Sequence, residues 1–425
     1  MHELTASDAA ERIRAGRATS QSLVRACLDR IEARENDVRA WEFIDPQLAL
    51  QQAQAADRET PRGALHGVPI GIKDIIDTVD MPTTLGSPLY AGRRPQWDAA
   101  CVAAVRAAGA IVMGKTVTTE FAYFEPGKTR NPHNLRHTPG GSSSGSAAAV
   151  ADKMVPIAFG SQTAASVIRP ATFCGVFGYK ASFGELSLSG IRPFAESLDT
   201  LGILARSVAD ISLLRAVLLG TANDARRVPV TTPPKLAVCR TAQWPVADES
   251  TRAAVDSTVE AVRRAGARVT ELSLPGHFAG LIDAQKSIMA YEAARNYVFE
   301  TTRHPEKVSA AFRALTNAGS AISRDAYWEA KRAVAAAASE LHALFGDCDA
   351  LIAPAAVGEA PLADTGTGDP VMSRMWTALH VPCLAVPVAT GPQGLPVGIQ
   401  LIAPLGADES LLRVGEWTRE ALTKR

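Results

Sequence analysis

The chain has 425 residues, of which 47% are hydrophobic and 21% are charged, values that are ordinary for a globular protein. This length allows two or three domains or one large α/β domain, and it can bury a core without disulfide or metal staples. The formal net charge is zero, so composition gives no electrostatic reason to expect a nucleic acid or an anionic membrane as a partner.

The N-terminal segment, residues 1–4, has no basic start followed by an apolar run, so no signal peptide is expected. No stretch of about 20 apolar residues is present to span a bilayer. The six cysteines are scattered without close pairs, which favours free thiols in a reducing compartment over a disulfide framework or a zinc site. We therefore expect a cytoplasmic protein that holds no metal and no other cofactor.

Predicted helices and strands alternate along the chain. Apolar stripes and caps predict helices at residues 7–14 with Ser7 as the cap, from Ser20 onward, and at 98–108, 147–151, 249–264 and 324–344. Short apolar runs predict strands at residues 68–72, 110–113, 155–159, 235–239, 268–272, 381–388 and 397–402. The alternation indicates an α/β protein. The turn-like stretch 231–234 is a candidate boundary, just before a strand-helix-strand unit.

Residues 130–146 are rich in Asn, Pro, His, Gly and Ser, so they are expected to form a loop. The loop ends in the run 140–146, which reads Gly-Gly-Ser-Ser-Ser-Gly-Ser. Such a run is often a flexible linker. Here an Ala-rich helix follows at once, so the run would lie at a helix N-terminus, where backbone N–H groups favour developing negative charge.

Two other functions of this loop have to be weighed. Residues 141–145 match G-x-S-x-G, which would make Ser143 the nucleophile of an α/β-hydrolase elbow, but that motif requires a buried strand directly before it. The preceding residues are polar and loop-like. His133 and His137 have a spacing seen in metal sites, yet no third ligand lies near, so ordinary hydrogen bonds are favoured.

Ser166 follows a run of small residues, 160–165, and precedes Val-Ile-Arg-Pro. Small residues let a substrate carbonyl approach the backbone amides. Those amides can stabilise a tetrahedral oxyanion, a contribution of roughly 3 kcal/mol per donor. A serine in a tight turn is the alternative interpretation of this segment alone.

Three segments, residues 65–74, 138–150 and 162–179, closely resemble the amidase signature family. The resemblance continues through residues 197–207 and 394–402, and it is weakest at about 215–345. It implies an α/β fold with a large mixed β-sheet covered by helices on both faces. It also implies a single domain over residues 1–425, in which the region at about 215–345 helps to shape the substrate pocket.

Carried over residue by residue, the resemblance implies that Lys73 is the base, Ser142 the relay and Ser166 the nucleophile that forms the acyl-enzyme. In this family the relay serine follows a cis peptide bond, here that between Gly141 and Ser142. A lysine accepts a proton only when it is neutral, so we expect Lys73 to be desolvated or near other positive charge.

The resemblance also implies an oxyanion hole, and the sequence departs from the family at this point. Its donors would be the backbone N–H groups of Thr163, Ala164, Ala165 and Ser166. The family usually reads Asp-Thr-Gly-Gly-Ser here, whereas this chain has Gln162 in place of the aspartate and alanines in place of the glycines. Alanine keeps the N–H, but its Cβ penalises a positive φ and narrows the approach to the scissile carbonyl.

Candidate substrate-binding residues are Tyr123, Arg169, Arg192, Phe194 and Trp376. The aromatic members can equally be core or rim packing. The family's arginine usually stands at the position of Ile168, and here it comes one residue later as Arg169. The form Gln-Thr-x-x-Ser-Val-Ile-Arg-Pro resembles malonamidase-type members, which favours a substrate carboxylate as its ligand. A structural ion pair is the open alternative.

These features predict an amidase that hydrolyses the C–N bond of a small-molecule amide to an acid and ammonia or an amine. One alternative is an amidotransferase subunit of a tRNA-dependent transamidation complex. Another is a ureido hydrolase of the biuret or allophanate type, and a third is a binding protein without turnover. We expect no nucleic acid or membrane partner. A homodimer is allowed, although no sequence feature requires one.

Overall fold

The computed structural model describes residues 1–221 and 232–424. One eleven-stranded sheet runs through the described part, in the strand order β1-β3-β2-β4-β6-β5-β10-β11-β9-β7-β8. The strands are β1 (Trp41–Ile44), β2 (Pro69–Lys73), β3 (Ile111–Thr116), β4 (Ile157–Gln162), β5 (Phe177–Lys180), β6 (Thr200–Ala205), β7 (Lys235–Val238), β8 (Arg268–Glu271), β9 (Ala350–Pro354), β10 (Cys383–Thr390) and β11 (Pro396–Ile402). The sheet is mixed: β2 pairs in parallel with β3 and β4, whereas β4, β6, β5, β10 and β11 pair in an antiparallel manner.

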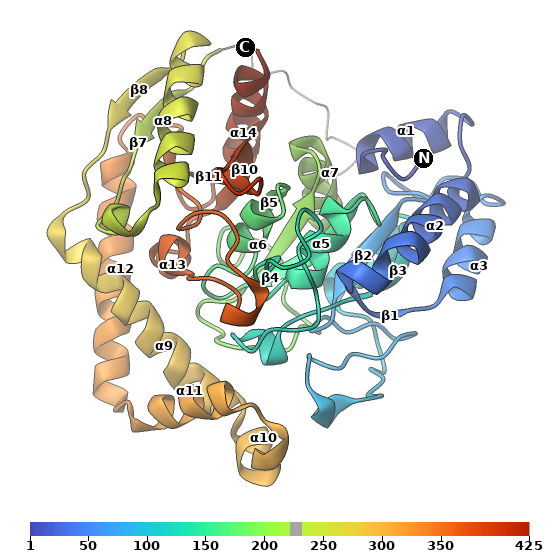
Figure 1. Cartoon of the computed structure of the whole chain (residues 1–425), viewed down its shortest axis with the longest axis horizontal. Coiled ribbons are helices and arrows are strands. Elements are labelled where there is room, and N and C mark those ends of the chain that lie inside the picture. Colours follow the sequence, from blue (N-terminus) through green and yellow to red (C-terminus); the bar gives the residue numbers. More distant parts are fainter. Residues whose placement is uncertain (222–231, 425) are drawn as a thin grey trace.

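Helices surround this sheet (Figure 1). They are α1 (Ala6–Arg14), α2 (Ser20–Val38), α3 (Pro46–Ala56), α4 (Ala100–Ala107), α5 (Ser144–Ala151), α6 (Ile168–Phe173), α7 (Val208–Leu218), α8 (Glu249–Arg264), α9 (Leu281–Asn296), α10 (Val298–Arg303), α11 (Ala310–Ala321), α12 (Arg324–Phe345), α13 (Val371–Ala378) and α14 (Asp408–Thr423). Figure 1 shows α9 to α12 together at one end of the molecule, away from α1 to α3.

Side-chain alternation along β5 shows that helices cover both faces. A Cβ on Gly178 would lie 2.4 Å from the Cβ of Ala171, which belongs to α6. The next residue, Tyr179, points to the opposite face, where its hydroxyl donates to Asp408 at the start of α14 (2.5 Å). The predicted fold class, a large mixed sheet with helices on both faces, is therefore confirmed.

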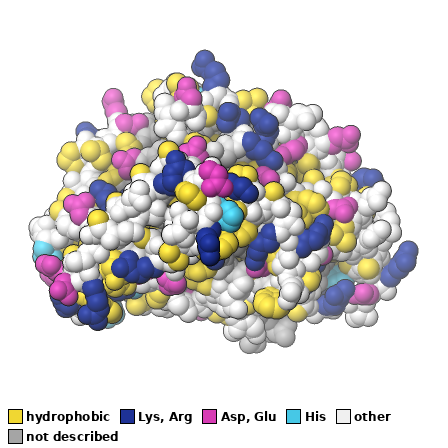
Figure 2. Space-filling view, turned by 90° about the horizontal axis from the view of Figure 1, so that it is seen from below, with side chains coloured by type: hydrophobic (Ala, Val, Ile, Leu, Met, Phe, Trp, Pro, Cys, Tyr) yellow, Lys and Arg dark blue, Asp and Glu magenta, His cyan; other side chains and the backbone are white. Residues whose placement is uncertain are grey.

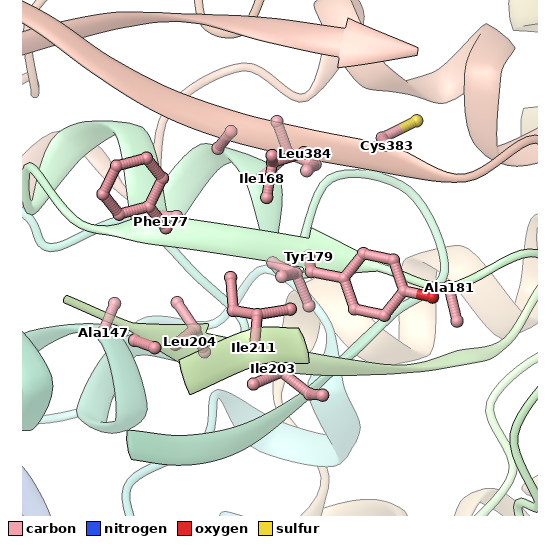
Figure 3. Packing of buried hydrophobic residues seen from close by; sticks show 14 of the residues in the cluster. Ala147, Ile168, Phe177, Tyr179, Ala181, Ile203, Leu204, Ile211, Cys383 and Leu384 are labelled. Atoms are coloured by element: carbon pink, nitrogen blue, oxygen red, sulfur yellow. The ribbon is translucent and has the colours of Figure 1, made fainter. Parts of the chain in front are cut away.

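The core is built where these layers meet. Figure 3 shows buried side chains from α6 and α7, among them Ile168 and Ile211, around strands that carry Tyr179, Leu204 and Leu384. All of these side chains belong to one continuous hydrophobic cluster. Helix α6, which directly follows the candidate nucleophile, is thus fixed to the sheet by burial of its apolar face.

Several predicted elements need correction at their ends. Helix α1 begins at Ala6 and is capped by Thr5, whose side chain accepts from the N–H of Asp8. Ser7 does not cap it, because both its N–H and its hydroxyl donate to Asp210 instead. The strand predicted at 155–159 lies at Ile157–Gln162, two to three residues later. The helix predicted at 249–264 is confirmed as α8.

The candidate boundary at 231–234 falls partly outside the described residues. The strand that follows it, β7, pairs with β9 and so belongs to the same sheet as the rest of the described chain. No helix in the described part of the chain has both the length and the apolar character needed to cross a membrane. On the face in Figure 2, basic and acidic side chains are interspersed, in keeping with the zero net charge.

Candidate active site

Lys73 is the last residue of β2, and its side chain is fully buried. Its Nζ is 2.6 Å from the Oγ of Ser142 and 2.9 Å from the Oγ of Ser161. Burial lowers the pKa of Lys73 to about 7, and the negative charge of Asp199 acts in the opposite direction. A lysine with such a pKa is neutral in a substantial fraction of molecules near pH 7, so it can accept a proton from the hydroxyl beside it.

The peptide bond between Gly141 and Ser142 is cis in the structure. Helix α5 begins two residues later, so the run 140–146 does lie at a helix N-terminus. Its glycines serve close packing: a Cβ on Gly145 would lie 2.2 Å from the carbonyl oxygen of Ala40. The loop that holds Ser142 is therefore a packed, buried segment and not a flexible linker.

The hydroxyl of Ser143 is already engaged. It accepts from the N–H of Ser161 and donates to the carbonyl of the same residue, both at 3.3 Å. Residues 138–143, all of them described, form no strand, so the structural context of the G-x-S-x-G elbow is missing. The ring nitrogens of His133 and His137 bond to the backbone carbonyls of Cys174 (3.0 Å) and Ala360 (2.6 Å).

In the loop from Thr163 to Ser166, every carbonyl group is hydrogen-bonded, whereas the N–H groups have no acceptor among the described residues. The four carbonyl oxygens accept from Gln285 Nε2 (Thr163, 2.9 Å), Thr377 Oγ1 (Ala164, 2.7 Å), Arg169 N (Ala165, 3.0 Å) and Ser143 N (Ser166, 3.3 Å). In the described part of the chain, no acceptor receives a hydrogen bond from the N–H of any of these four residues. Each of the four is at most 8% exposed. Because buried N–H groups are almost always paired, four free ones in succession indicate a place for a ligand oxygen.

The side chain of Gln162, the residue just before this loop, stabilises the loop by hydrogen bonds. Its Oε1 accepts from the N–H groups of Val167 (2.9 Å) and Ile168 (3.0 Å), while its Nε2 donates to the hydroxyl of Thr377 (3.0 Å). The amide thus orders the residues on both sides of Ser166 without a charge. Neither of the two alanines in the loop has a positive φ, so the Cβ groups impose no left-handed strain there.

Asp199 also contacts this loop, through the side chain of Thr163. It accepts from the hydroxyl of that residue and from the backbone N–H groups of Phe194 (2.7 Å) and Ala195 (3.0 Å). Burial raises the pKa of Asp199 to about 7, against the effect of these donors. Sequence reasoning included residues 197–207 in the family resemblance without giving Asp199 a role, and it did not find Ser161, Gln285 or Thr377.

Three of the candidate substrate-binding residues lie in packed surroundings. Phe194 is 3% exposed, and its ring stacks on that of Tyr123, with 5.8 Å between centroids. Trp376 is fully buried on α13. The guanidinium of Arg192 donates to Glu300 (2.8 Å) and lies over the ring of Tyr297. Their contact with a substrate stays a prediction.

Arg169 is buried beside the cis peptide. Its Nη2 donates to the carbonyl of Gly141 (2.8 Å) and to the hydroxyl of Thr367 (3.1 Å), and its Nη1 donates to the carbonyl of Gly368. Within the described residues it forms no ion pair, so the structural ion pair considered as an alternative is not found there. Its contact with a substrate carboxylate stays a prediction.

Residues 22–412 match the family model named Amidase. The chain is 33% identical to one chain of the glutamyl-tRNA(Gln) amidotransferase of Chloroflexus aggregans, over 98% of this chain and 96% of that protein. It is also similar to the solved native peptide amidase from Stenotrophomonas maltophilia, with a TM-score of 0.84, 27% identity, and coverage of 100% of this chain and 98% of that one. A third similar protein is a solved structure from work on a vestigial protein complex and the evolutionary origins of an s-triazine catabolic enzyme. Its TM-score is 0.90 at 27% identity, over 98% of both chains. The family match spans the lysine and both serine segments, and we conclude that this chain belongs to the Amidase family.

Proposed function

We propose that this chain hydrolyses the C–N bond of a small amide through an acyl-enzyme on Ser166, with Lys73 as the base and Ser142 as the relay. The observation that supports this most directly is the 2.6 Å contact between a buried lysine and a serine hydroxyl. The lowered pKa of Lys73 suits a proton acceptor near neutral pH. The N–H of Ser143 donates to the carbonyl of Ser166, so the two serine segments are adjacent.

In the first half of the reaction, the Oγ of Ser166 attacks the amide carbonyl carbon. Its proton passes to the Oγ of Ser142, whose own proton passes to the Nζ of Lys73. The carbonyl oxygen becomes an oxyanion, and the free N–H groups of residues 163–166 would stabilise it, each by roughly 3 kcal/mol. The proton then returns through Ser142 to the nitrogen, the C–N bond breaks, and ammonia or an amine leaves.

In the second half, water replaces the amine. Lys73 takes a proton from the water through Ser142, the hydroxide adds to the acyl carbon, and the oxyanion occupies the same N–H groups. When the intermediate collapses, the proton returns to the Oγ of Ser166 and the carboxylic acid is released. Each half-reaction begins and ends with the same protonation state, so the cycle needs no other reactant than water.

The test is ammonia release from a panel of aliphatic, aromatic, dicarboxylic and ureido amides by the wild type and by Ser166→Ala. Ureido compounds belong in the panel because the same nucleophile can attack a carbamoyl carbon. We expect release by the wild type and loss of at least about 10³-fold in the variant. Equal rates in both proteins would overturn the assignment of Ser166.

The second candidate function is that of one chain of an amidotransferase complex, and the 33% identity to the Chloroflexus aggregans protein over 98% of this chain favours it. Such a chain needs partner chains and an acyl-tRNA, whereas a hydrolase acts alone. Purification from the native host separates the two: a chain that elutes alone and is active alone is a hydrolase. The size of the purified protein shows whether it is a homodimer, and fractionation of the same cells tests the predicted cytoplasmic location.

A further inference from the structure

A buried arginine near the nucleophile loop lacks an anionic partner. Arg374 lies on α13 and is 6% exposed. Its Nη1 donates to the Oε1 of Gln285, a neutral amide. Among the described residues, its Nε and Nη2 donate to no acceptor, and no carboxylate lies within ion-pair distance of it. A desolvated cation without such a partner is strongly unfavourable, so something else has to compensate its charge.

Two partly buried arginines of the described chain find acceptors for their guanidinium groups within the protein. Arg206 donates to four backbone carbonyls, at 2.6 to 3.2 Å. Arg192 is paired with the buried carboxylate of Glu300 at 2.8 Å. Arg374 has neither arrangement. Its Nε and Nη2, which have no acceptor among the described residues, are therefore available to a molecule that enters from outside.

The position of Arg374 connects it with the nucleophile loop in two ways. Gln285, which accepts from Arg374, donates through its Nε2 to the carbonyl of Thr163 (2.9 Å). Thr377 lies three residues along α13 and donates to the carbonyl of Ala164 (2.7 Å). Residues three apart share one face of a helix, so the guanidinium and the loop-binding hydroxyl point to the same side. Arg374 therefore lies beside the loop that contains Ser166.

The surroundings of Arg374 are suited to an anion with a short carbon chain. Two guanidinium groups lie near the ring of Phe124: the Cζ of Arg374 is 5.9 Å from the ring centroid and the Cζ of Arg169 is 5.6 Å from it. Phe124 and Tyr123 are only partly buried, so this region is open on one side. Asp369 and Asp283 attract Arg374 electrostatically without forming an ion pair with it, and both are exposed to solvent. Two cations beside one aromatic ring favour a carboxylate.

We propose that Arg374 binds a carboxylate of the substrate, so that the amides cleaved at Ser166 carry a negative charge. This inference rests on the proposed function and names its substrate class. Two kinds of amide fit: the monoamide of a dicarboxylic acid, with the carboxylate on the acyl side, and an N-acyl amino acid, with the carboxylate on the leaving amine.

The experiment compares anionic amides with neutral amides of the same length. Succinic and glutaric monoamides are set against butanamide and pentanamide for the acyl side, and N-acetylglycine against N-ethylacetamide for the leaving side. Each is assayed with the wild type, Arg374→Gln and Arg374→Lys. A charge-assisted hydrogen bond corresponds to about 10- to 100-fold in affinity, so we expect Arg374→Gln to lose that much kcat/KM on the anionic member, mostly in KM. The neutral member should show only the loss that a weaker hold on Gln285 causes, which both members share, so the anionic member should lose about 10- to 100-fold more than the neutral one, and Arg374→Lys should lie between.

An equal loss on anionic and neutral amides, or no preference for anionic amides in the wild type, would overturn the role of Arg374 and leave the proposed hydrolysis standing. If no amide is cleaved by any of the proteins, the proposed function fails, and binding decides the inference separately. Succinate and glutarate should then raise the Tm of the wild type and not that of Arg374→Gln. No difference between the two proteins would overturn the inference.

Discussion

The side-chain amide of Gln162 and the hydroxyl of Thr377 lie 3.0 Å apart, and together they hold the loop that contains Ser166. The hydroxyl of Thr377 in turn donates to the carbonyl of Ala164 (2.7 Å). The amide oxygen accepts from two N–H groups beyond the nucleophile. These contacts engage the carbonyl side of the loop and leave its N–H side to a ligand.

Removing the hydroxyl of Thr377 should therefore loosen the loop. Thr377→Val keeps the shape of the side chain but leaves the buried carbonyl of Ala164 without a donor. We expect a loss of about 1–3 kcal/mol in the free energy of unfolding and a fall of about tenfold in kcat. Denaturant unfolding and steady-state kinetics with the best amide of the panel measure the two effects.

Thr418→Val is the matched control. Thr418 is also a fully buried threonine on a helix, α14, but its Oγ1 has no hydrogen-bond partner among the described residues. Its replacement removes no hydrogen bond, so the free energy of unfolding should stay the same or rise, and kcat should stay within about twofold of the wild type. If the Thr377 and Thr418 variants behave alike, the proposed role of Thr377 in the loop is wrong.

Replacing Lys73 by methionine should separate catalysis from stability. The change removes the proton acceptor and retains most of the volume in the buried position. We expect kcat to fall by about 10²- to 10⁴-fold, the range for loss of a positioned general base. The Tm should stay the same or rise, because the variant no longer buries an amine whose protonated form is unfavourable away from water. A variant that folds and keeps more than a tenth of kcat would contradict the role of Lys73.

The pH dependence of kcat/KM follows from the pKa of Lys73, which burial lowers to about 7. The base has to be neutral, so activity should rise with pH through about 7 and fall away as Lys73 is protonated below it. Asp199 raises this pKa, and Asp199→Asn should therefore shift the rising limb to lower pH. A limb that shifts to higher pH or disappears in Asp199→Asn would show that Asp199, whose own pKa is raised to about 7, sets the profile.

Restoring the usual glycines of the family at positions 164 and 165 should not help this chain. Both alanines have φ values outside the positive region, so no strain is relieved by removing their Cβ groups. Two Ala→Gly changes add freedom to the unfolded chain and should cost about 1–2 kcal/mol of unfolding free energy in total. Thermal unfolding of the double variant measures this. A gain in stability would mean that the alanines are strained after all.

The fold could be predicted from sequence where one element is defined by its own residues. The apolar stripe and the Asp248 cap define α8, and its bounds agree with the prediction. The start of α1 could not be predicted in this way, because Ser7 is recruited by Asp210, about 200 residues away. A contact between distant segments has no local signal.

The same distinction applies to the site. Lys73 and Ser142 lie in motifs that are recognisable on their own, and the structure brings their side chains within 2.6 Å. On α13, the aromatic ring of Trp376 made it the candidate substrate-binding residue, and that ring is fully buried. Arg374 and Thr377 lie on the other side of the same helix, toward Gln285 and the loop. Which side of α13 packs against the loop has no signal in the local sequence.

The most direct test of the account is to label the protein with a fluorophosphonate and locate the adduct by peptide mass spectrometry. We expect a single adduct on Ser166, absent in Ser166→Ala and formed more slowly in Ser142→Ala and Lys73→Met. An adduct on Ser142 or Ser143, or labelling that persists in Ser166→Ala, would contradict it.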